Sequence, residues 1–190
     1  MDIGNFLEKM AYDWARSEAP EQIKDEYYCA TRDVFQARLD SMVSFLLAGK
    51  VAEGDAYMLA AIAGEIGNNS FDHNLGSWPD VPGVFFGCDL NGTQAIIVLA
   101  DRGQGVLKTL KRVKPELEND EEALFTAFHE KLSGRAPESR GNGLKFVREA
   151  IEGSKKHLTF ISGSAKMELN EKINISRTEA VRGCLAIIAL

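Results

Sequence analysis

Cysteine, long apolar runs and an apolar amino-terminal segment are scarce or missing in this 190-residue sequence. The three cysteines, Cys29, Cys88 and Cys184, are odd in number and match no metal-site spacing, which argues against a disulfide framework or a zinc site. No run of about 18 apolar residues occurs, so we expect no membrane span. The amino-terminal segment has acids and an early lysine in place of the apolar region of a signal peptide. We therefore expect a protein of the reducing cytoplasm.

Positive charge is also in short supply. Lysine and arginine total 22 against 28 aspartates and glutamates, which gives a formal net charge of -6. Nonspecific binding to nucleic acids depends on basic patches, so we expect no nucleic-acid partner. A small anionic ligand is still compatible with this charge, because backbone dipoles bind phosphate locally. Hydrophobic residues make up 45% of the chain, which is enough for the core of a single domain.

The spacing of apolar residues predicts an α+β fold. Apolar residues recur at helical spacing from the start to about residue 50. Further helices are expected at 55–73, 105–114, 121–131 and 144–151. Strands are expected at 84–89 and 94–100, and then at 158–161, 165–169, 173–176 and 184–189. The pair Asn91-Gly92 favours a type I′ hairpin turn. This order predicts a two-layer α/β sandwich with helices on one face of the sheet.

The first polar segment lies on the helix expected at 55–73. Glu65, Asn69 and His73 follow one another at intervals of four residues and so share one helix face. An asparagine carbonyl is a hard oxygen ligand that suits Mg²⁺, which takes few protein ligands. A glutamate one turn away can accept a proton from an attacking water or hydroxyl. The alternative interpretation is an ordinary solvated helix face.

The second polar segment, from Asp101 to Gly105, follows the apolar strand expected at 94–100. A carboxylate at a strand end can accept a hydrogen bond from an exocyclic amine such as that of adenine. The glycines Gly103 and Gly105 would let the backbone approach a ligand closely. The alternative is a simple turn between a strand and a helix.

The third segment, Arg140-Gly141-Asn142-Gly143-Leu144, opens the helix expected at 144–151. Free backbone N–H groups at the start of a helix attract phosphate oxygens. The sequence contains no P-loop G-x-x-x-x-G-K-[ST] and no dinucleotide fingerprint between a strand and a helix. The alternative interpretation of this segment is a flexible hinge.

Taken together and in this order, the three segments resemble the N-box and the two glycine boxes of the GHKL superfamily of ATPases. The N-box motif E-x-x-x-N matches Glu65 and Asn69, and His73 falls where many kinase-type members carry a histidine. The first glycine box, D-x-G-x-G, matches Asp101, Gly103 and Gly105. The second, G-x-G-L, matches Gly141, Gly143 and Leu144. The resemblance covers roughly residues 55–190.

This resemblance implies a mixed, largely antiparallel sheet, with Mg-ATP held between the N-box helix and a lid at about residues 106–140. It implies that Asn69 coordinates Mg²⁺ and that Asp101 holds the adenine amino group. The amides around Gly141 and Gly143 would receive phosphates, and Glu65 would act as general base. His73, Gly103, Gly105, Arg140, Asn142 and Leu144 complete the expected nucleotide site.

One departure from the family pattern concerns the last strand. Many members have Gly-Thr there, and the threonine helps to hold the adenine through water. This chain has Gly183-Cys184. A thiol is a weaker hydrogen-bonding group than a hydroxyl, so the adenine contact at this position would be weaker.

The positions of the histidines indicate which kind of GHKL protein the chain resembles. Residues 1–54 contain no histidine, so the dimerising helical hairpin of a self-phosphorylating histidine kinase is not expected. The chain resembles instead the small stand-alone anti-sigma-factor serine kinases, whose partners are sigma factors or STAS-type antagonists. Two functions stay open: a Mg-ATP-dependent ATPase or serine/threonine protein kinase, and a non-catalytic module that captures a partner when ATP binds. Residues 1–54 are expected to form a helical extension, for dimerisation, partner binding or packing, and residues 55–190 the ATP-binding domain.

Overall fold

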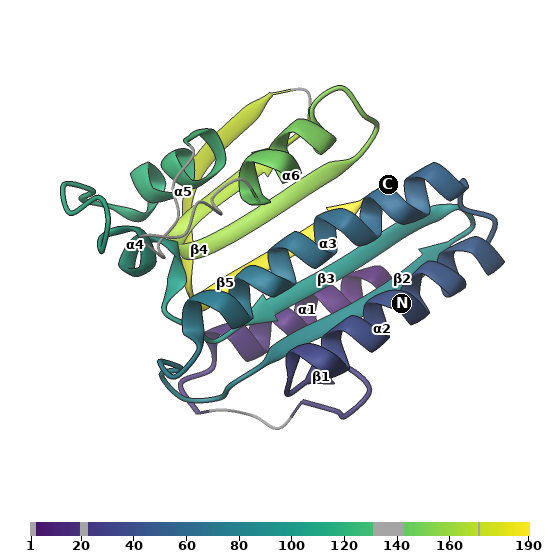
Figure 1. Cartoon of the computed structure of the whole chain (residues 1–190), viewed down its shortest axis with the longest axis horizontal. Coiled ribbons are helices and arrows are strands. Elements are labelled where there is room, and N and C mark those ends of the chain that lie inside the picture. Colours follow the sequence, from purple (N-terminus) through teal and green to yellow (C-terminus); the bar gives the residue numbers. More distant parts are fainter. Residues whose placement is uncertain (1–2, 20–22, 131–142, 171) are drawn as a thin grey trace.

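The computed structural model describes residues 3–19, 23–130, 143–170 and 172–190, which form a sheet covered by helices (Figure 1). None of the helices in these ranges is long and apolar enough to cross a membrane. The helices are α1 (Ile3–Arg16), α2 (Arg32–Ala48), α3 (Glu53–Asn74), α4 (Gly105–Leu110), α5 (Asp120–His129) and α6 (Gly143–Ile151). The strands are β1 (Tyr28–Cys29), β2 (Val84–Asn91), β3 (Gln94–Asp101), β4 (His157–Leu169) and β5 (Ile173–Ala189). The predicted α+β class is confirmed.

The strands lie in the order β1-β2-β3-β5-β4, and each neighbouring pair is antiparallel. The mixed sheet implied by the family resemblance is therefore wrong for the part of the chain that the structure describes. The sequence does not predict β1, because two residues show no periodicity. Asp101, at the end of the central strand β3, lies opposite Val84 of β2 on one side and Cys184 of β5 on the other. This register brings the D-x-G-x-G segment next to β5.

The hairpin between β2 and β3 turns one residue later than predicted. Asn91 pairs with Gln94, so the two turn residues are Gly92 and Thr93. Only Gly92 has a positive φ, of 64°, and Thr93 does not. A positive φ at the first turn position alone is the pattern of a type II′ turn, whereas type I′ requires it at both. The predicted hairpin is confirmed and its turn type is wrong.

The last four predicted strands form two long ones. β4 includes both 158–161 and 165–169, and β5 includes both 173–176 and 184–189. The register of β4 against β5 shifts between Ser162 and Ala165, where Gly163 has a φ of 56°. Such an irregularity bends a strand without ending it. The glycine therefore marks a bulge in one strand and not a break between two.

The larger hydrophobic core lies between one face of the sheet and helices α2 to α6. Thr31 caps the start of α2, where its hydroxyl accepts a hydrogen bond from the Val34 amide. The buried ring of Phe35 on α2 lies 5.4 Å from the ring of Phe86 and 6.1 Å from that of Phe71. These aromatic contacts fix α2 and α3 against the sheet.

Helix α1 lies on the opposite face of the sheet, behind the strands in Figure 1. The expectation of helices on one face is therefore right for α2 to α6 and wrong for α1. Its buried residues Leu7, Ala11, Trp14 and Ala15 form a second core with Phe85, Val98, Ala100, Ile161, Val181 and Leu185. Successive strand residues point to opposite faces, so one sheet serves both cores.

The described part of residues 1–54 belongs to the same sheet and cores as the rest. Strand β1 pairs with β2, α2 packs in the larger core, and α1 forms the smaller one. The first 54 residues thus pack against the remainder, and packing was one of the three roles expected for them. The division of the chain at residue 54 stays a prediction.

We predict opposite effects of alanine at two glycines of α3. An ideal Cβ on Gly67 would lie 2.2 Å from Cζ of the buried Phe35, whereas a Cβ on Gly54 would meet nothing within 4 Å. Gly67→Ala should cost about 1–3 kcal/mol through overpacking. Gly54→Ala should stabilise by up to about 1 kcal/mol through helix propensity. Urea unfolding of both variants measures this, and equal effects would contradict the packing of α2 on α3.

Candidate functional site

The polar stripe predicted on the N-box lies on α3, the longest helix in the described ranges. Glu65 is exposed, and Asn69 and His73 are half-buried. The same helix buries Ile62, Ile66 and other apolar residues in the larger core. The stripe is therefore the side of α3 that does not pack on the sheet.

The start of α6 lies directly against this stripe. An ideal Cβ on Gly143 would lie 2.6 Å from Oε2 of Glu65 and 3.5 Å from Nδ2 of Asn69. Glycine is thus the residue that lets the α6 backbone approach these side chains. The start of a helix presents unpaired N–H groups and a positive dipole end. Two segments separated by more than 70 residues in the sequence, the N-box and the second glycine box, therefore meet.

The carboxylate of Asp101 holds the D-x-G-x-G turn from inside the protein. Asp101 is 2% exposed, and its Oδ2 accepts a hydrogen bond of 2.7 Å from Ser70 Oγ of α3. Its Oδ1 accepts one of 2.7 Å from the Gly103 amide, and the backbone N–H of Cys184 also donates to the carboxylate. A carboxylate offers about four lone-pair positions, so three donors leave room for one more. The structure therefore gives Asp101 a structural role beside the adenine contact expected of it.

A second residue of α3 holds the same turn. The amide of Gln104 donates to Asn74 Oδ1 at 2.8 Å, and Asn74 Nδ2 donates to the Ser70 carbonyl at 2.8 Å. Gln104 Nε2 donates to the carbonyl of His73 at 3.1 Å. Sequence reasoning missed Ser70 and Asn74. Their spacing of four residues, one position after Asn69 and His73, is the signal that could have found them.

The D-x-G-x-G turn also packs closely against the sheet, at Gly183 and Gly105. An ideal Cβ on Gly183, whose φ is 66°, would lie 2.2 Å from Asp101 Oδ1 and 2.5 Å from the Gly103 nitrogen. A Cβ on Gly105, whose φ is 73°, would lie 3.1 Å from Ser162 Oγ. That hydroxyl accepts a hydrogen bond of 2.9 Å from the Val106 amide. Gly105 and Gly183 are thus required for close packing of the turn against β4 and β5.

Burial changes the acidity of the two side chains that face each other across β3 and β5. Burial raises the pKa of Asp101 to about 6, although Ser70 and the amides of Gly103 and Cys184 favour the charged form. Burial also raises the pKa of the Cys184 thiol well above its usual value, and the charge of Asp101 adds to this. Cys184 is therefore a neutral thiol.

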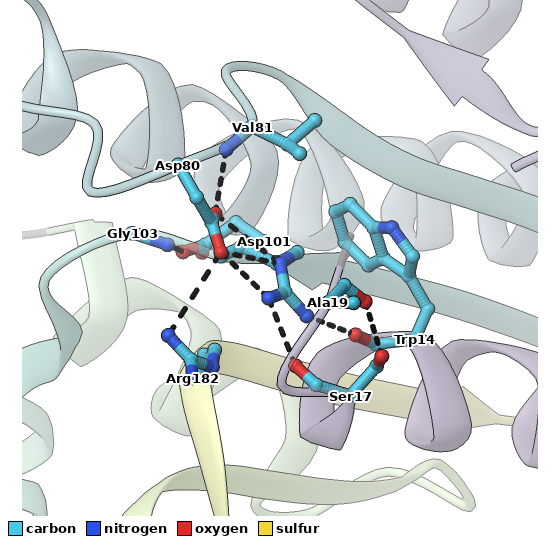
Figure 2. A network of polar contacts seen from close by, with 9 residues as sticks. Trp14, Ser17, Ala19, Asp80, Val81, Asp101, Gly103 and Arg182 are labelled. Atoms are coloured by element: carbon cyan, nitrogen blue, oxygen red, sulfur yellow. Dashed lines mark hydrogen bonds and ion pairs between the residues drawn. The ribbon is translucent and has the colours of Figure 1, made fainter. Parts of the chain in front are cut away.

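Arg102, the variable position of D-x-G-x-G, is fully buried on the other side of the sheet. Its guanidinium donates to both carboxylate oxygens of Asp80, at 3.0 Å and 2.6 Å to Oδ2 and 3.2 Å to Oδ1. It also donates to the carbonyls of Trp14 at 2.5 Å and Ser17 at 2.9 Å, at the end of α1 (Figure 2). Burial opposes ionisation of Asp80, but hydrogen bonds from Arg102 and the Val81 amide lower its pKa. The turn is thus tied to both layers of helices.

A cavity of about 210 Å³ adjoins the turn, where β4 and β5 shift register. Neither Glu65 nor Asn69 lines it, so the cavity is separate from the polar stripe. Its glycines pack against Asp101, Asp120, Asn74 and Ser162, which accounts for them without a ligand. The lining consists of Pro79, Arg102, Gly103, Gln104, Gly105, Leu107, Asp120, Gly163, Val181, Arg182 and Gly183.

Part of the expected site lies outside the described residues. Arg140, Gly141 and Asn142 belong to the undescribed range 131–142, as does the end of the expected lid, from residue 131 to 140. Leu144 is half-buried and packs against the larger core at the start of α6. Within the described ranges, no group of three or more His, Cys, Asp or Glu side chains is arranged to hold a metal ion. A magnesium ion there would depend on Asn69, water and the ligand itself.

The raised pKa of Asp101 predicts a specific pH dependence of stability. Its value of about 6 in the folded protein exceeds the value of about 3.9 in the unfolded chain. Its contribution to stability is therefore fully present below about pH 4 and is lost as the pH rises through about 6. The loss is of the order of 3 kcal/mol. Asp101→Asn, measured by urea unfolding from about pH 4 to pH 7, should remove this slope, and parallel curves would contradict it.

Comparison with known proteins adds no further assignment to these residues. No protein-family model matches the sequence, and no curated protein matches it significantly, so the function has to be inferred from the site itself.

Proposed function

We propose that this protein is a cytoplasmic, Mg-ATP-binding regulatory protein of the GHKL type, which acts on a protein partner as an ATPase or serine/threonine kinase. One observation carries the proposal: the backbone at Gly143 lies against Glu65 and Asn69 on α3. The start of α6 supplies N–H groups for phosphate, and α3 supplies an amide and a carboxylate beside them. Such a combination suits the charged end of a nucleotide.

The other end of the nucleotide would lie near the C-terminal part of α3. Ser70, one residue after Asn69, holds the carboxylate of Asp101. The same stretch of α3 thus contacts both glycine boxes, and a single ligand along the helix would reach both. An amine donor such as that of adenine would take the acceptor position that the three donors to Asp101 leave.

The donor chemistry of the stripe fits magnesium bound together with phosphates. Mg²⁺ prefers oxygen ligands, keeps several waters and takes few protein ligands. Asn69 offers one neutral carbonyl oxygen, so the ion would be held mainly by the phosphates and water. The ion would supply charge neutralisation on the phosphates. Residues of α3 and α6 bind and orient the ligand.

Glu65 is the residue that would act as general base. It is an exposed residue of α3, one turn of helix from Asn69, and lies beside the start of α6. A carboxylate there could accept the proton of an attacking water, which gives an ATPase, or of a serine or threonine hydroxyl of a partner, which gives a kinase. Sigma factors and STAS-type antagonists are the partners that the family resemblance suggests.

We predict that two small changes weaken binding of a non-hydrolysable ATP analogue with Mg²⁺. Asn69→Ala removes the amide, and Gly143→Ala places a methyl group 2.6 Å from Glu65 Oε2, where α6 would approach the ligand. Each should weaken binding by about tenfold or more, or 1.4 kcal/mol. Asn69→Ala should also reduce the dependence on Mg²⁺. Titration calorimetry of the whole chain measures these affinities.

The matched control is Asn68→Ala, which removes the same side chain from the neighbouring position of α3. It should bind the analogue like the wild type. No binding by the wild type at millimolar analogue, or equal weakening by Asn68→Ala and Asn69→Ala, would count against the site.

Turnover separates the enzyme from the alternative, an ATP-gated module that captures a partner. Glu65→Gln keeps the size and polarity of the side chain and removes its basicity. In an enzyme it should bind the analogue and lose phosphate release by about 10² to 10⁴-fold. Phosphate release that Glu65→Gln leaves unchanged would exclude Glu65 as the base, and partner capture that survives the change would support the module.

A further inference from the structure

The dipeptide Asp101-Arg102 connects the two sides of the sheet at the candidate site. The side chain of Asp101 bonds to Ser70 of α3 on one side. The next side chain, Arg102, bonds to the Trp14 and Ser17 carbonyls of α1 on the other. Successive residues at the end of a strand point to opposite faces, which is why a two-residue segment can do this.

Arg102 bonds to α1 at a point where the helix needs a donor. The last carbonyls of a helix lack partners inside it, and the end of its dipole is negative. Trp14 is within the last turn of α1, and Ser17 follows the helix. The Arg102 guanidinium also lies 5.7 Å from the Trp14 ring centre. The position of Arg102 therefore depends on α1 being docked.

Helix α1 packs on the sheet without contributing buried residues to the larger core. Its contacts form a second hydrophobic cluster, distinct from the larger core of α2 to α6. Two of its four fully packed side chains, Ala11 and Ala15, are small. The buried indole Nε1 of Trp14 has no hydrogen-bond acceptor among the described residues, which weakens the docked state.

We propose that α1 is a regulatory helix whose docking is coupled to nucleotide affinity, with Arg102 as the positioning residue. The inference rests on the proposed function, because it assigns a regulation to the same site. When α1 is docked, Arg102 is held by α1 and Asp80 and fixes the turn that contains Asp101 and Gly103. When α1 leaves, the guanidinium loses its two carbonyl acceptors and the turn loosens. A partner that binds α1 or its face of the sheet would thereby release the nucleotide.

The coupling must be reciprocal if it is an equilibrium effect. A factor by which docked α1 strengthens nucleotide binding is also the factor by which nucleotide strengthens the docking of α1. If Arg102 only supported the turn structurally, nucleotide would not strengthen the docking of α1. Protection of the α1 amides by nucleotide is therefore the distinguishing measurement.

The test uses the full chain and a matched pair of glutamates on α1. Ala11→Glu places a charge in the buried contact with the sheet, whereas Phe6→Glu places the same side chain, with the same change in charge, at an exposed position of α1. Amide exchange of residues 7–15 reports the docking of α1, and that of residues 101–106 reports the turn. Calorimetry gives the affinity for the ATP analogue with Mg²⁺.

We expect Ala11→Glu to expose the α1 amides, speed exchange in the turn and weaken analogue binding by about tenfold. Phe6→Glu should resemble the wild type, and the analogue should slow exchange in wild-type α1. Arg102→Lys keeps the charge without the planar fork and should weaken binding by itself. The double variant with Ala11→Glu should bind only slightly more weakly than Ala11→Glu alone, because α1 no longer holds Arg102 in that variant.

The failures of the two proposals are distinguishable. A wild type that does not bind the analogue refutes the proposed function, while exchange in the nucleotide-free variants still tests the link between α1 and the turn. Ala11→Glu with exposed α1 amides but unchanged exchange in the turn, or unchanged affinity, overturns the coupling. So does an analogue that binds tightly without protecting α1. Should Ala11→Glu not fold, Arg102→Lys decides the question through the same two readouts.

Discussion

The buried charge of Arg102 is the constraint around which the candidate site is arranged. A guanidinium removed from water is costly unless its donors are satisfied, and this one is fully buried. It is satisfied by one carboxylate, Asp80, and by two carbonyls at the end of α1. The segment before β2, the end of β3 and the end of α1 must therefore assemble together. Loss of Asp80 would leave the charge without a counter-ion, and loss of the end of α1 would leave two hydrogen bonds unmade. These three elements are therefore coupled in energy as well as in space.

Asp101 adds a second buried charge one residue away, on the side of α3. Burial raises the pKa of Asp101 more than the hydrogen bonds from Ser70, Gly103 and Cys184 lower it, so the pKa is raised overall. The turn thus carries a well-compensated cation on one side and a poorly compensated anion on the other. Such an anion gains from any further donor that reaches it. A further donor that reached this carboxylate would recover part of the cost of burying it.

The sequence predicts individual elements of this site better than their contacts. Helical periodicity is enough to place Glu65, Asn69 and His73 on one face of α3, because that relation is local. The face that meets the turn, marked by Ser70 and Asn74, depends on how α3 crosses the sheet, which no local pattern encodes. Gly163 shows the same limit, since a glycine in an apolar run predicts a break and is here a bulge.

Helix α1 and Arg102 show why the rest could not be predicted. An amphipathic helix has the same apolar pattern whichever face of a sheet it covers, so nothing local places α1 opposite α2 and α3. Arginine is usually solvated, and in D-x-G-x-G it occupies the position that the motif leaves free. Its burial follows only from the two carbonyls and the carboxylate that surround it, which come from distant parts of the chain. The motif thus predicts a possible ligand contact and gives no indication of what holds the turn in place.

Glu65 lies beside the start of α6, where the proposed ligand would place its phosphates. A carboxylate is the kind of group that the positive end of a helix attracts, and Glu65 Oε2 already lies beside Gly143. Under the proposed function, a phosphate bound at the start of α6 would lie close to this carboxylate, and the two negative charges would repel each other. This repulsion would favour a position of Glu65 further from α6. In the proposed ATPase or kinase, the carboxylate would then be free to accept a proton.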